Sequence, residues 1–129
     1  MAKLKEQPYG TALAELMAEK TKVLSQAQAF SEMRLDSTAR PLWLAAATLE
    51  ERIAPLLDVI DRDREAAVHR VSAASCYQKA GELSRAANLY QAALAGPLLD
   101  ASRSEVEQLL ETCLANLAVS PSTLSAVAM

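Results

Sequence analysis

Residues 41–60 read PLWLAAATLEERIAPLLDVI and carry the longest amphipathic pattern in the chain. Apolar residues recur there at three- and four-residue steps, the spacing that places side chains on one face of an α-helix. They are Leu42, Ala45, Ala46, Leu49, Ile53, Leu56, Leu57 and Ile60. Pro41 suits the first turn of such a helix, where a backbone N–H is not needed. The stretch therefore predicts a helix over residues 41–60.

Pro55 lies inside this stretch, on the other face. A proline within a helix removes one backbone hydrogen bond and presses on the carbonyl four residues earlier, here that of Glu51. We expect a kink at this point. The alternative is a break, followed by a new helix that begins with a capping box of Thr48 and Glu51.

A helical pattern also precedes this stretch, over residues 12–35, with Thr11 as its N-cap. Asp36, Ser37 and Thr38 then supply polar turn residues, because their side chains compete for backbone hydrogen bonds. The predicted buried stripe of this first helix is Leu13, Leu16, Met17, Leu24, Ala27 and Phe30.

Three more helical patterns follow the mixed-charge run at 61–65. The first continues to about Ala80 and ends at Gly81, and the second spans 83–95 and ends at Gly96 and Pro97. The third opens with a capping box of Ser102 and Glu105. The apolar residues that define these three patterns are Ala67, Val71, Ala74, Tyr77; Ala86, Leu89, Tyr90, Ala93, Leu94; and Val106, Leu109, Leu110, Cys113, Leu114, Leu117.

Composition supports the same fold class. The 129 residues are 51% hydrophobic, and Ala and Leu together supply roughly a third of them. These are strong helix formers, and the connections between the patterns are short, which places neighbouring helices antiparallel. We therefore predict an all-α fold, an antiparallel up-and-down bundle of four to five helices. Residues 11–118 form one helical domain, between a flexible N-terminal segment (1–10) and a flexible C-terminal tail (119–129).

Charge and cysteine content narrow the classes of partner. The 13 basic and 16 acidic residues give a net charge of −3, with no basic surplus for nucleic acid. Acidic and basic residues interrupt the longest apolar stretch, so no membrane span is expected. The spacing of Cys76 and Cys113 matches neither a zinc site nor a disulfide framework. A cytoplasmic protein without cofactor or metal is the expectation.

Residues 67–97 read AVHRVSAASCYQKAGELSRAANLYQAALAGP. Small residues stand where two helices of a hairpin would cross, an aromatic residue stands on each helix, and a glycine lies at the turn. These positions are held by Ala74, Tyr77, Gly81, Ala86, Tyr90 and Ala93. The segment resembles a single tetratricopeptide repeat. It departs from the family pattern at Arg70, where the family has Trp, and at Pro97, which comes early.

The resemblance implies a non-enzymatic interaction module of the adaptor or scaffold type, which binds a protein or peptide. In that family the first helix of each hairpin lines a concave groove. Carried onto this chain, the groove positions are Val68, Val71, Ser75, Gln78 and Lys79. The last predicted helix would then act as a capping helix. No second copy of the motif lies 34 residues away on either side.

Candidate chemistry is sparse. His69 is the only histidine, and Glu65 lies one helical turn before it, so a metal-dependent bundle enzyme is the least favoured alternative. We predict instead that His69 is a surface or boundary residue, that both cysteines are structural, and that Trp43 is a half-buried core edge. The protein is thus not expected to be an enzyme. The main alternative function is a self-associating bundle that dimerises through the apolar face of a helix.

Overall fold

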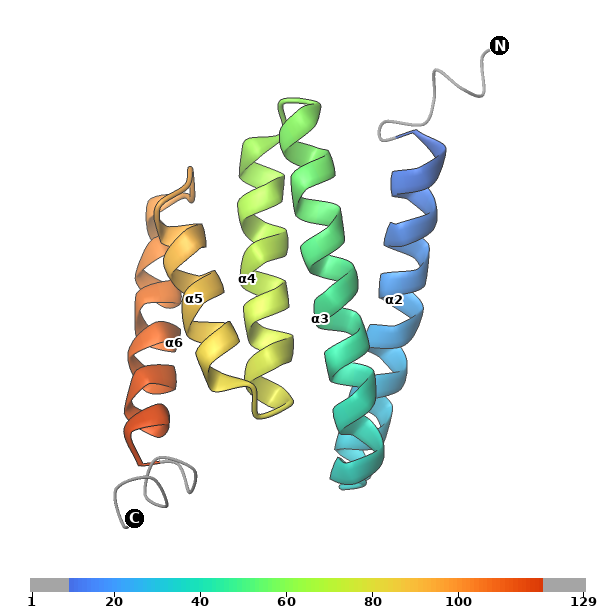
Figure 1. Ribbon diagram of the computed structural model, residues 1–129, viewed down its shortest axis with the longest axis vertical. Coiled ribbons are helices and arrows are strands. Elements are labelled where there is room, and N and C mark those ends of the chain that lie inside the picture. Colours follow the sequence, from blue (N-terminus) through green and yellow to red (C-terminus); the bar gives the residue numbers. More distant parts are fainter. Residues whose placement is uncertain (1–9, 120–129) are drawn as a thin grey trace.

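The computed structural model describes residues 10–119, and within them the prediction of an all-α fold is confirmed (Figure 1). Five helices and no strand occur in this part of the chain. The helices are α2 (Thr11–Glu32), α3 (Asp36–Val59), α4 (Asp63–Lys79), α5 (Leu83–Leu94) and α6 (Asp100–Ala118). The predicted flexible segments at 1–10 and 119–129 lie outside the described residues, except for Gly10 and Val119.

The helices run alternately up and down and stand in a row in chain order (Figure 1). The main contacts join each helix to the next one in sequence, from α2 against α3 to α5 against α6. This order follows from the short connections, which leave a helix little choice of neighbour. The arrangement places α3, α4 and α5 between two neighbours each.

The first three turns share one geometry. In each, a residue with positive φ follows the helix: Arg34 at 62°, Asp61 at 61° and Gly81 at 84°. The next backbone N–H then bonds to a carbonyl five residues earlier, as from Glu82 to Tyr77 at 2.8 Å. This is the Schellman arrangement, which satisfies carbonyls at the end of a helix. Glycine was the sequence signal for it, and only the third turn has one.

The helix boundaries differ from the prediction at the start of α2, between α2 and α3, and at the start of α6. Asp36, Ser37 and Thr38 form the first turn of α3 and not a separate turn, and the first helix ends at Glu32. Pro41 consequently lies beyond the first turn of α3. The carboxylate of Asp36 favours this early start, because it interacts well with the positive end of the helix dipole. At α2, Gly10 and not Thr11 occupies the N-cap position.

α3 passes through Pro55 as one continuous helix, which excludes the alternative of a break at this proline. Thr48 donates its hydroxyl to the carbonyl of Leu44 at 3.0 Å, an internal contact of the same helix, and forms no cap. The predicted capping box at Ser102 is also wrong. α6 begins at Asp100, with Leu99 in the N-cap position and no side-chain cap.

The α5–α6 connection is held by Arg103 of α6. Its guanidinium donates to the carbonyl of Leu94, at the end of α5, at 2.5 Å and to that of Gly96 at 2.9 Å. The Leu94 carbonyl, which the end of α5 leaves without an intrahelical partner, is thereby satisfied, and the Gly96 carbonyl also accepts from the Leu98 N–H at 3.0 Å. Arg103 therefore joins the end of one helix to the start of the next.

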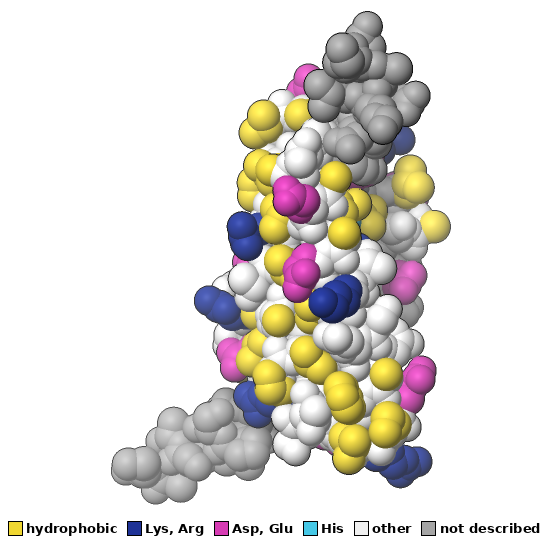
Figure 2. Space-filling model, turned by 90° about the vertical axis from the view of Figure 1, so that its right-hand side faces the viewer, with side chains coloured by type: hydrophobic (Ala, Val, Ile, Leu, Met, Phe, Trp, Pro, Cys, Tyr) yellow, Lys and Arg dark blue, Asp and Glu magenta, His cyan; other side chains and the backbone are white. Residues whose placement is uncertain are grey.

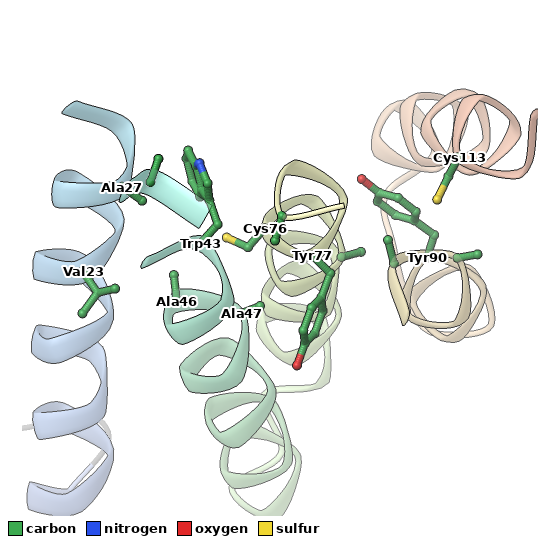
Figure 3. Packing of buried hydrophobic residues seen from close by; sticks show 14 of the residues in the cluster. Val23, Ala27, Trp43, Ala46, Ala47, Cys76, Tyr77, Tyr90 and Cys113 are labelled. Atoms are coloured by element: carbon green, nitrogen blue, oxygen red, sulfur yellow. The ribbon is translucent and has the colours of Figure 1, made fainter. Parts of the chain in front are cut away.

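Alanine dominates the contacts between the helices. Ala27, Ala46, Ala47, Ala74, Ala86 and Ala93 are all inaccessible to water, which lets neighbouring backbones come close. Larger side chains fill the remaining space, and Figure 3 shows Trp43 next to Ala27 and Cys76, and Tyr90 facing Cys113. Trp43 is 4% exposed, so the prediction of a half-buried edge is wrong.

The buried face of α3 is broader than the predicted stripe and turned relative to it. Leu56 and Ile60 are exposed, whereas Trp43, Glu50 and Ala54 are buried. The reason is that α2 and α4 both pack on α3, so two of its faces are covered. A single stripe is what one neighbour would need.

Candidate functional site

A groove runs between α4 and α6, and α5 separates the two helices along the chain. The groove has a volume of about 120 Å³, and its walls are mainly apolar. We call it the α4–α6 groove; its lining residues are Val68, Val71, Leu98, Ser102, Glu105, Val106 and Leu109. Two of the five predicted site residues, Val68 and Val71, therefore lie in it.

A larger pocket of about 350 Å³ continues the groove at the N-terminal ends of both helices. The two hollows share Val68, Leu98 and Ser102, so they form one continuous surface. We call this second hollow the end pocket; its lining residues are Arg64, Glu65, Val68, His69, Pro97, Leu98, Leu99 and Ser102.

The other predicted site residues have partners inside the protein. The Tyr90 hydroxyl donates to the side-chain oxygen of Gln78 at 2.7 Å, and Ser75 also hydrogen-bonds this hydroxyl. Lys79 places its ammonium 4.5 Å from the centre of the Trp43 ring on α3, a cation–π contact. Ser75 and Gln78 thus position Tyr90, and Lys79 turns toward α3.

His69 is bound to Glu50, a contact that the sequence did not predict. The Nδ1 atom of His69 lies 2.5 Å from a carboxylate oxygen of Glu50, and the Glu50 residue is only 1% exposed. Glu65, which the least favoured alternative paired with His69, forms an ion pair with Arg62 at 2.8 Å. The two members of the pair lie 19 residues apart on different helices, so no local pattern identifies them.

The pair contributes a fixed polar group to a mostly apolar pocket. A buried carboxylate is costly unless it is paired and hydrogen-bonded. With Nδ1 directed at Glu50, the ring of His69 is held in one orientation, and Nε2 is the ring atom left for a ligand. No cluster of three or more His, Cys, Asp or Glu side chains suited to a metal ion occurs in residues 10–119.

The two cysteines are buried, as predicted, and neither is poised as a nucleophile. Burial raises the pKa of the Cys76 thiol from 9.0 to about 11, and the nearby charge of Glu50 adds to the effect. Burial likewise raises the pKa of Cys113, whose Sγ donates to the Leu83 carbonyl at 3.2 Å. Thiols with raised pKa values hold little thiolate at neutral pH, and the thiolate is the reactive form.

Tyr77 of α4 and Tyr90 of α5 are buried, and the hydroxyl of each forms hydrogen bonds with polar side chains. Tyr77 donates to Glu51 and receives a hydrogen bond from Arg85 at 3.2 Å. Burial raises the pKa of Tyr90 to about 12. Both hydroxyls therefore remain protonated near neutral pH and serve as hydrogen-bond donors within the fold.

Comparison with other proteins gives no family assignment, because no family model, curated protein or solved structure matches this chain. Among the helices described, none combines the length and the hydropathy that crossing a bilayer requires. The groove and the end pocket are therefore interpreted from their own chemistry.

Proposed function

We propose that the protein is a non-enzymatic helical interaction module that binds a protein or peptide segment in the α4–α6 groove. The observation that carries the proposal is the continuity of this groove with the end pocket, which together form an apolar channel between two helices. Grooves between helices are common sites for extended or helical segments of a partner.

The resemblance of residues 67–97 to a tetratricopeptide repeat also supports the α4–α6 groove as the binding surface. It implies that α4 is the first helix of a hairpin and that α6 is the capping helix beside it. The groove then lies where that family places its ligands. The proposal moves the binding residues from Ser75, Gln78 and Lys79 to the α6 wall, where Glu105 and Leu109 face Val68 and Val71.

The affinity is expected to be modest. Stable protein–protein interfaces bury on the order of 1,200–2,000 Å² in total, and a groove of this size with one end pocket offers less. Weak, transient binding of a short segment is the mode that fits such a surface.

Site-specific photo-crosslinking in the cells of origin tests the proposal. A photoreactive amino acid placed at Leu109 should capture a defined partner, and one placed at the exposed Glu19 of α2 should not. Val68→Asp should abolish the capture at Leu109, because it puts a charge into the apolar groove. Val68 is 55% exposed, so the fold tolerates the change. The same proteins captured at both positions, or capture that survives Val68→Asp, would disprove the proposal.

Self-association is the second proposal, and one observation favours it. Leu56, Val59 and Ile60, at the end of α3, are 39%, 79% and 41% exposed. The other large residues of the predicted stripe, Leu42, Leu49, Ile53 and Leu57, lie in or against the core, so this end is the large apolar part of the stripe that remains for a second copy. Light scattering at high concentration should give twice the monomer mass, and Val59→Glu should return the monomer. A monomer at all concentrations rules the dimer out.

A further inference from the structure

We propose that residues 120–129 occupy the α4–α6 groove of their own chain and compete there with the partner segment. The competition rests on the proposed function of the groove, whereas the docking of the segment does not. Three observations support the docking. The segment is long enough to reach the groove, an uncharged track on α6 leads from its attachment point to the groove, and the segment itself carries no charge.

The groove lies within reach of the segment. Residue 120 follows Val119, and Leu109 of the groove wall lies ten residues before Val119 on α6. At 1.5 Å per residue along a helix, Val119 and Leu109 are about 15 Å apart. Ten residues of extended chain span up to about 33 Å, so the segment can run back along α6 beyond Leu109. Pro121 lacks the backbone N–H that a continued helix needs, which favours a change of direction after α6.

An uncharged track on α6 joins the attachment point to the groove. Thr112, Asn116 and Val119 follow Leu109 at three- and four-residue steps, the spacing of residues that share one face of a helix. All three are exposed, so this face of α6 is open to water. Glu111 is offset from Thr112 by about 100° around the helix axis and points away from the track.

The composition of the segment matches this surface. Residues 120–129 read SPSTLSAVAM and contain no Asp, Glu, Lys, Arg or His, although 22% of the whole chain is charged. Leu124, Val127 and Met129 are its large apolar residues. When such a side chain enters the groove, the apolar walls are removed from water and no charge of the segment has to be buried.

The other segment that lies outside the described residues fits the groove less well. Residues 1–9 carry Lys3, Lys5 and Glu6, whose charges would have to leave water. They join the chain at the start of α2, and α2 and α6 stand at opposite ends of the row of helices (Figure 1). Residues 120–129 are therefore the occupant that both charge and position favour.

Attachment to the same chain makes a weak contact sufficient. A segment on a short linker is present at its site at an effective concentration on the order of 1 mM. A contact with a dissociation constant of about 0.1 mM would then be occupied about nine-tenths of the time and would weaken partner binding roughly tenfold. The modest affinity expected of a groove of this size is thus enough for regulation.

Nuclear magnetic resonance of the whole chain tests the docking. Leu124→Asp puts a charge on an apolar residue of the segment and should shift the backbone amide signals of Val71, Val106 and Leu109 from their wild-type positions. Ser122→Asp is the matched control, because it adds the same charge to the same segment at a polar residue, and it should leave these three signals in place. Both positions follow the end of α6, so neither substitution alters a residue of the five helices.

Capture by the photoreactive amino acid at Leu109 tests the competition in the same two variants. The yield of captured partner should rise up to roughly tenfold in Leu124→Asp, because the groove is then open. It should stay at the wild-type level in Ser122→Asp.

The outcomes separate the docking, the competition and the proposed function. Unchanged signals in Leu124→Asp, or equal shifts in both variants, would overturn the docking and leave the groove as a partner site. Shifts that grow with protein concentration would place the segment on a second copy, contrary to an intrachain contact. Shifts without a rise in capture would refute the competition. If no partner is captured in any variant while Leu124→Asp still shifts the three signals, the proposed function fails and the docking stands.

Discussion

At the scale of single residues, the pair of Glu50 and His69 is the least expected feature of the fold. Glu50 is the one charged residue buried in the part of the chain described. A buried pair often adds little net stability, because removing both groups from water costs about as much as their attraction returns. Removing only one member of the pair is destabilising, because the other member is then left buried without a partner.

His69→Ala should lower the free energy of unfolding by about 3 kcal/mol, because it leaves the Glu50 carboxylate buried and unpaired. Urea unfolding followed by circular dichroism measures this. The double variant Glu50→Met with His69→Leu should recover most of the loss, since it removes both polar groups. A loss in His69→Ala below about 0.5 kcal/mol, the size of an ordinary surface substitution, would contradict the buried pair.

Cys76 makes stability depend on pH in the alkaline range. Its pKa is about 11 in the folded chain and 9.0 ordinarily. Between these values the unfolded chain releases the thiol proton and the folded chain keeps it. The unfolded state then binds fewer protons, so stability falls as pH rises.

We therefore expect the wild type to lose on the order of 2 kcal/mol more than Cys76→Ala between pH 8 and pH 11. Urea unfolding at several pH values provides the comparison. The variant shares every other titrating group, so it isolates the thiol. Parallel pH profiles of the two proteins would mean that Cys76 titrates normally in the folded chain.

At the scale of the elements, the turns between helices depend on residues with positive φ. An L residue pays roughly 1–2 kcal/mol to adopt this conformation, and glycine does not. Gly81 meets the requirement in the turn between α4 and α5, whereas Arg34 bears the cost between α2 and α3. The two turns therefore predict substitutions with opposite effects.

Gly81→Ala should lower the free energy of unfolding by about 1–2 kcal/mol through backbone strain alone. A Cβ atom at this position would lie 3.9 Å from the nearest atom, in Arg40, so it meets no steric obstacle. Arg34→Gly should raise stability by about 0.5–1 kcal/mol, the strain removed less the added freedom of the unfolded chain. Thermal unfolding measures both.

Gly96→Ala is the matched control for these turns. Gly96 has no positive φ, and an added Cβ would lie 3.4 Å from the Ala93 carbonyl oxygen, an ordinary contact. Its effect should stay within about 0.5 kcal/mol. If Gly81→Ala were as mild as Gly96→Ala, the left-handed turn would not be a requirement of the hairpin.

At the scale of the whole molecule, the arrangement in a row means that the stability of each helix depends mainly on the helices next to it. Each helix packs mainly against its sequence neighbours, an arrangement that resembles the nearest-neighbour coupling of repeat proteins. Figure 2 views the row from the α2 side, where apolar side chains are interleaved with acidic and basic ones. α2 and α6 have one main neighbour each, whereas α3, α4 and α5 have two.

Hydrogen exchange should therefore be graded along the row. Backbone amides in the middle of α3 and α4 should exchange most slowly, and those of α2 and α6 should exchange through local opening at lower free energy. Mass spectrometry of the exchanging native protein resolves the helices separately. Equal protection of all five helices would show one cooperative unit, contrary to this expectation.

The sequence by itself determined the helical class, the approximate extent of the five helices and the alanines at the crossings of α4 and α5. These follow from local propensity and from apolar spacing within single helices, which act over short distances along the chain. The tetratricopeptide resemblance, and not the periodicity, is what singled out Val68 and Val71, which line the α4–α6 groove. Gly81 marked its turn because the backbone there requires positive φ.

Tertiary structure alone decided which faces are covered and which charges meet. Trp43 is buried because α3 has neighbours on two sides, and Glu50 meets His69 because α3 and α4 pack together in one register. The end pocket joins α4 to the start of α6, more than thirty residues away. Contacts between residues distant in the chain depend on packing, and packing leaves no periodic trace in a single sequence.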